Sequence, residues 1–61
     1  SPAHVHVLGK GGFAVFKLHC PDGPPELRET LGLTRKEVNV IANQLDSVVG
    51  HLCSKWREVH G

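Results

Sequence analysis

Apolar and polar residues alternate along two short stretches near the start of the chain. Residues 3–8 and 13–19 both follow this pattern, and the turn residues Gly9-Lys10-Gly11-Gly12 separate them. Such an arrangement is typical of a β-hairpin. A slip of one residue would turn one strand's apolar set to the wrong face, so we predict that Leu8 pairs with Phe13. In this register one face holds Ala3, Val5, Val7, Ala14, Phe16 and Leu18.

The opposite face of the predicted hairpin carries the groups that can do chemistry. His4 and His6 point the same way, because side chains alternate between faces along a strand. Histidine is also the side chain that changes charge near neutral pH. The predicted cross-strand pairs on this face are His4 with Lys17, His6 with Val15, and Leu8 with Phe13, and His19 follows near the open end.

Apolar residues recur at helical spacing in the last part of the chain. Thr34-Arg35-Lys36-Glu37 fits a capping box, in which Thr34 and Glu37 bind each other's backbone N–H groups at the start of a helix. We therefore predict a long helix over residues 35–60 that covers the apolar face of the hairpin. Its stripe comprises Val38, Ile41, Ala42, Leu45, Val48, Val49, Leu52, Cys53, Trp56 and Val59.

The predicted helix is longer than the hairpin that it covers. At 1.5 Å per residue it would span about 39 Å, so part of the stripe needs another partner. Gly50 lies inside the pattern, and a kink is expected there because glycine lowers helix propensity by roughly 1 kcal/mol relative to alanine. A coiled-coil-like contact with a second copy is one solution, through the heptad-spaced Val38, Leu45, Leu52 and Val59.

The segment between hairpin and helix is open to two interpretations. Pro21-Asp22-Gly23-Pro24-Pro25 is a loop by composition. After it, residues 26–31 fit a short helix, with Leu27 and Leu31 four apart and Gly32 as a stop. They also fit a third, edge strand. Local signals alone favour the short helix.

Length and charge limit the possible functions. A chain of 61 residues is at most one domain with a small core. Its formal net charge of +1 argues against strong nonspecific attraction to nucleic acid or acidic membranes. The sequence holds no apolar run long enough to cross a bilayer and no signal-peptide pattern. We therefore predict a single α+β domain over residues 1–61, and take a soluble cytoplasmic protein as the default.

The two cysteines match none of the paired-cysteine metal spacings. We interpret Cys20 and Cys53 as free thiols. The alternative is a single Cys20–Cys53 disulfide across a sheet-helix interface, since a small domain gains from a covalent staple.

Several motifs together resemble a known family. They are Ser1-Pro2-Ala3-His4-Val5-His6-Val7, the glycine turn followed by a strand, Glu26-Leu27 leading to Gly32-Leu33-Thr34, and Leu52-x-x-x-Trp56-x-Glu58-x-x-Gly61. This combination resembles the small bacterial family called domain of unknown function 4160. The resemblance implies a cytoplasmic α+β protein, often encoded beside a second small domain in a toxin-antitoxin-like pair. It also implies that residues 26–31 form a strand.

Two departures from the family pattern bear on partners. Members usually carry an aromatic-rich β segment before the His-x-His strand. They also usually have a second proline at the position that Ala3 occupies in this chain. Without that segment a sheet edge is left open, and we expect a partner to cover Leu8, Phe13 and Val15. The leading interpretation is a protein-interaction module of a toxin-antitoxin-like pair, homo-oligomeric, with no membrane contact and no cofactor.

The histidines allow two other functions. Two histidines two apart on a strand have Cα atoms about 6.6 to 6.8 Å apart, so both rings could reach one ion. Zinc would need His19 or another ligand beside His4 and His6, and no carboxylate lies on the hairpin. Alternatively, His4, His6 and Lys17 suffice as base, acid and cation for cleavage of RNA. The runner-up is therefore a small endoribonuclease-like toxin.

Overall fold

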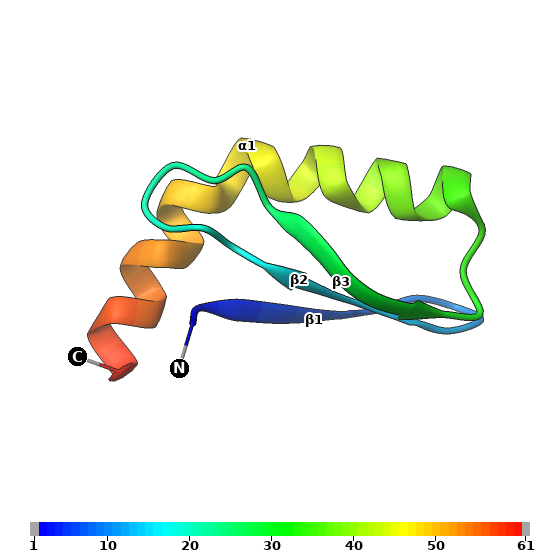
Figure 1. The fold of residues 1–61 in the computed structure, drawn as a ribbon, viewed down its shortest axis with the longest axis horizontal. Coiled ribbons are helices and arrows are strands. Elements are labelled where there is room, and N and C mark those ends of the chain that lie inside the picture. The colour runs from blue at the N-terminus through cyan, green and yellow to red at the C-terminus, as the bar shows by residue number, and fades with distance from the viewer. Residues whose placement is uncertain (1, 61) are drawn as a thin grey trace.

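A three-stranded antiparallel sheet with one long helix on one face makes up the fold (Figure 1). The computed structural model describes residues 2–60. The strands are β1 (His4–Leu8), β2 (Phe13–Lys17) and β3 (Glu26–Leu31), in the spatial order β1-β2-β3, and the helix is α1 (Arg35–His60). The predicted α+β fold is confirmed.

The hairpin has the predicted register. Leu8 pairs with Phe13, Val5 with Phe16 and His4 with Lys17. The turn is closed by a hydrogen bond of 2.8 Å from the Gly9 N–H to the Gly12 carbonyl. This turn is a plain hairpin connection, and the alternation of apolar residues on either side of it determines which face packs against α1.

Residues Glu26–Leu31 form a strand, so the local preference for a short helix was wrong. The strand pairs with the free edge of β2, a long-range contact that local propensity cannot report. Its register shifts once: Val15 pairs with Glu29 and Phe16 with Leu27, which leaves Arg28 between them as a bulge. All six residues of β3 are exposed, so no buried apolar face identifies it in the sequence.

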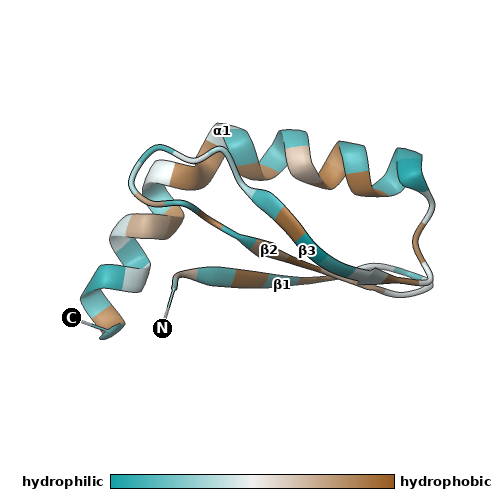
Figure 2. Ribbon diagram, viewed as in Figure 1, coloured by the Kyte–Doolittle hydropathy of each residue, from teal (hydrophilic) through white to brown (hydrophobic). Residues whose placement is uncertain are grey.

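The core lies between the sheet and α1 and consists of two small clusters. The first is built around Phe16 and Ala14, and the second around Leu18. Phe16 and Leu18 are the largest fully buried side chains. Figure 2 shows apolar bands recurring along α1 and alternating with polar bands along the strands. The helix residues buried against the sheet are Val38, Leu45, Val49 and Cys53.

The helix begins as predicted, with a capping box. The Thr34 N–H donates to Glu37 Oε1 at 2.8 Å, and the Glu37 N–H donates to the Thr34 hydroxyl oxygen at 3.1 Å. The hydrogen bond from the Thr34 N–H lowers the pKa of the Glu37 carboxyl below its ordinary value, and the Thr34 hydroxyl beside that carboxyl acts in the same direction. The capping box therefore fixes the start of α1 directly after Thr34.

A bend in α1 takes up the surplus length of the helix. Figure 1 shows the helix changing direction in its yellow-to-orange part, the part that contains Gly50, so that its end descends beside the start of β1. An alanine methyl at Gly50 would meet nothing within 4 Å. Packing therefore does not require glycine here, and its backbone freedom suits the bend. With this bend most of the apolar stripe packs within the chain, although Val59 is 76% exposed.

Cys20 and Cys53 form a disulfide, so the interpretation of both as free thiols was wrong. The bridge joins the loop after β2 to the second half of α1, which is the sheet-helix staple that the sequence left as the alternative. Cys53 is 3% exposed and packs with Leu18 and Val49. Spacing along the chain could not reveal this pair, because only the folding of α1 back over β2 brings the two residues together.

Candidate functional site

The face of the sheet that points away from α1 is here called the outer face. Among residues 2–60 it is uncovered except at the start of β1, where the end of α1 reaches His4 (Figure 1). Its two ends differ in chemistry. One end is apolar and lies beside the β1-β2 turn. The other end carries nitrogen-bearing side chains and lies beside the start of β1.

The apolar end is formed by three side chains on three neighbouring strands, and we call it the apolar corner. Leu8 pairs with Phe13, and Phe13 pairs on its other side with Leu31. Leu8 is 83% exposed and Leu31 is 68% exposed, which is unusual for such large apolar side chains in neighbouring positions. The sequence predicted Leu8, Phe13 and, next to them, Val15 as partner-binding. Leu31 was not predicted as partner-binding, because its position beside Phe13 depends on the pairing of β3 with β2.

His4, the first residue of β1, and His6, its central residue, are neighbours on the outer face. Their ring centroids are 5.5 Å apart. His4 Nδ1 lies 3.1 Å from the Pro2 carbonyl oxygen, which can only accept a hydrogen bond. Nδ1 therefore carries the proton in the neutral ring, and Nε2 keeps its lone pair free to accept a proton.

The end of α1 also contacts the His4 ring. Trp56 meets His4 edge to face with centroids 5.1 Å apart, and His60 lies over Trp56 at 4.0 Å. Trp56 is half-buried and lies outside both buried clusters. It therefore works as a contact between α1 and the start of β1, and the same contact positions the imidazole of His4.

Three side chains from three strands line one pocket of about 210 Å³ on the outer face. They are His4 of β1, Lys17 of β2 and Arg28 of β3, and Pro2 completes the lining. We call this group the basic end. His4 and Lys17 were predicted as a pair, and their pairing is confirmed. Arg28 was not predicted, because only the bulge in β3 brings it to this face.

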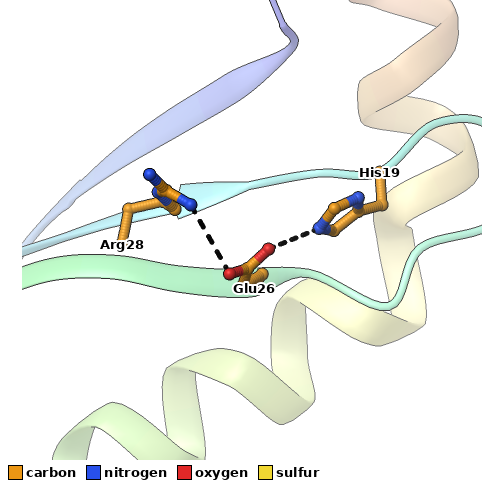
Figure 3. Close-up of polar contacts among 3 residues, drawn as sticks. All are labelled: His19, Glu26 and Arg28. Atoms are coloured by element: carbon orange, nitrogen blue, oxygen red, sulfur yellow. Dashed lines mark hydrogen bonds and ion pairs between the residues drawn. The ribbon is translucent and has the colours of Figure 1, made fainter.

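His19 does not join the other histidines but binds Glu26. Its Nε2 donates to Glu26 Oε1 at 2.6 Å, and Arg28 Nη1 lies 3.5 Å from Glu26 Oε2 (Figure 3). The hydrogen bond from His19 lowers the pKa of Glu26, and the charges of Arg28, His19 and Lys17 act in the same direction. Glu26 is thus ionised at neutral pH and is a partner of both His19 and Arg28.

A zinc site of His4, His6 and His19 is not assembled in this arrangement. Within residues 2–60 no three or more histidine, cysteine or acidic side chains come close enough to hold a metal ion. Over the same residues, α1 is not apolar enough to cross a membrane.

Comparison of the chain with protein families, curated proteins and solved structures finds no match. The resemblance to domain of unknown function 4160 therefore stays a prediction. What the chain does has to be inferred from the two ends of the outer face.

Proposed function

We propose that the chain is a small protein-interaction module whose apolar corner docks a second copy of itself. The observation that carries the proposal is the exposure of Leu8 (83%) and Leu31 (68%) on either side of Phe13. The family resemblance extends the proposal to a toxin-antitoxin-like pair, in which this module would be one member. No chemistry at the corner is required.

A second copy fits the apolar corner because the corner has no charged group among its three side chains. A two-fold contact places the same patch against itself, so an uncharged patch can meet its copy without burying unpaired charge. Each apolar side chain removed from water contributes about 25 cal/mol per Å² buried. A domain of 61 residues with two small core clusters gains from this additional burial.

The proposal is tested by the mass of the protein in solution, measured by light scattering after size-exclusion chromatography. The wild type is expected to be a dimer or larger, and Leu8→Glu with Leu31→Glu is expected to be a monomer. Val48→Glu is the matched control, because Val48 is also an exposed apolar residue (45%) but lies on α1. A monomeric wild type, or equal dissociation of the Val48 variant, would contradict the proposal.

The family that the chain resembles implies a cytoplasmic location, whereas the disulfide favours an oxidising compartment, in which the folded protein keeps its bridge. The cytosol keeps most thiols reduced. A cytoplasmic protein would therefore hold Cys20 and Cys53 in the reduced form, whereas an oxidising compartment would preserve the bridge.

A second candidate function is cleavage of RNA at the basic end. The observation that favours it is the hydrogen bond from His4 Nδ1 to the Pro2 carbonyl, which leaves Nε2 free as a base beside Lys17. His6 would serve as the acid and Lys17 as the cation. Purified protein is expected to cleave an RNA oligonucleotide, and His4→Ala or His6→Ala to lose that activity. Absence of cleavage, or cleavage that neither change affects, would reject this candidate.

A further inference from the structure

The basic end gathers nitrogen-bearing side chains from every strand of the sheet. His4, Lys17 and Arg28 come from β1, β2 and β3 and face the same pocket of about 210 Å³. This volume is below the range of about 300 to 1,000 Å³ that is usual for drug-sized ligands. The pocket therefore suits one small group, while the rest of a larger ligand would lie over the outer face.

The donors of this pocket are largely unused by the protein itself. Among the described residues Lys17 has no ion pair and no side-chain hydrogen bond. Arg28 has five N–H donors, and its contact is a single one of 3.5 Å with Glu26. His4 Nε2 is free, since the ring's bond to Pro2 uses Nδ1. A ligand with several acceptor oxygens can therefore bind without breaking a strong contact.

The charges around the pocket favour an anion. Lys17 and Arg28 are positive, and protonation of His4 would add a third positive charge. Glu26 is the opposing carboxylate, but His19 holds one of its oxygens and Arg28 contacts the other (Figure 3). Glu29 also lies on the outer face, across from Val15. The net charge at the pocket itself is therefore positive, although the carboxylate of Glu26 reduces it.

We propose that the basic end is a binding site for a phosphate group, contacted by His4, Lys17 and Arg28. A phosphate presents several oxygens in different directions, which suits donors that arrive from three strands. Arginine and lysine are also the side chains that most often bind phosphate. The group can come from inorganic phosphate or from a phosphodiester of single-stranded RNA. Binding does not require the cleavage proposed as the second candidate function, so binding without cleavage would reject only that candidate.

The test is a titration of the full chain, followed by the backbone amide signals in two-dimensional NMR spectra. Inorganic phosphate and a short uridine oligonucleotide are the two probes, and both are expected to shift the signals of His4, Lys17 and Arg28. Lys17→Gln and Arg28→Gln are each expected to weaken binding about three- to tenfold. Lys10→Gln is the matched control, because Lys10 lies in the β1-β2 turn at the other end of the sheet.

Glu26→Gln is expected to change the affinity in the opposite direction. It removes the carboxylate that competes for Arg28, so binding of either probe is expected to become tighter, which a purely structural role of Glu26 would not produce. Shifts with phosphate identify the group itself as the ligand, and shifts with the oligonucleotide alone identify its phosphodiester as the source; both outcomes support the site. No shift with either probe, or equal weakening by Lys10→Gln, would overturn the proposal.

Discussion

Reduction of the disulfide is expected to lower the free energy of unfolding by about 3 to 4 kcal/mol, because the bridge closes a long loop in the unfolded chain. Cys20 and Cys53 are 33 positions apart in the sequence. A domain of this size rarely has more than about 3 to 5 kcal/mol from its core, so the reduced protein should be largely unfolded near body temperature. Thermal unfolding followed by circular dichroism, with and without a thiol reductant, measures the effect.

Cys20→Ser separates loss of the bridge from other effects of the reductant. Cys20 is exposed, so the substitution removes the bridge without disturbing the core. The variant should melt at the temperature of the reduced wild type, and the reductant should not change its melting further. If the wild type melts at one temperature in both conditions, or if two free thiols react in the unfolded, unreduced protein, the bridge is absent.

The hairpin and the helix could be predicted because each has a complete local signal. The alternation on both sides of Gly9-Lys10-Gly11-Gly12 admits one register that gathers Ala3, Val5, Val7, Ala14, Phe16 and Leu18 on one face, and that register is the one observed. The capping box of Thr34 and Glu37 marks where the helix begins. Both signals involve residues near each other in the chain, so no tertiary contact is needed to interpret them.

The third strand could not be predicted in this way because its only structural partner is β2. Its six residues are all exposed, and Leu27 and Leu31 are as compatible with a helical turn as with a strand. The resemblance to a known family implied the strand, and the structure agrees with that implication. The interpretation of Cys20 and Cys53 as free thiols was wrong for the same reason, since their pairing depends on where a loop and a distant helix meet.

The candidate site was partly predictable for a related reason. Leu8, Phe13, His4 and Lys17 belong to the hairpin, so its register places them on the outer face. Leu31 and Arg28 belong to β3, and the bulge at Arg28 changes which residues of that strand face outward. Each end of the outer face therefore lacked one member in the sequence prediction, and in both cases the missing member came from β3.

Phe16→Ala is expected to destabilise the domain by about 3 to 5 kcal/mol, because it empties a fully packed position at the centre of the larger cluster. Phe16 is 1% exposed and packs with Val38 and Leu45 of α1. Urea unfolding of the oxidised protein measures the change. If the alanine variant does not fold, Phe16→Leu keeps most of the volume and should cost less than about 1.5 kcal/mol.

Phe13→Ala is the matched control, since the chain has two phenylalanines and both lie on β2. Phe13 faces outward beside Leu8 and Leu31, so its loss should cost stability by no more than about 1 kcal/mol. It should nevertheless weaken self-association, which Phe16→Leu should leave unchanged. Equal destabilisation by Phe13→Ala and Phe16→Ala would mean that the outer face is packed as tightly as the core, and the apolar corner would then not be free to dock a second copy.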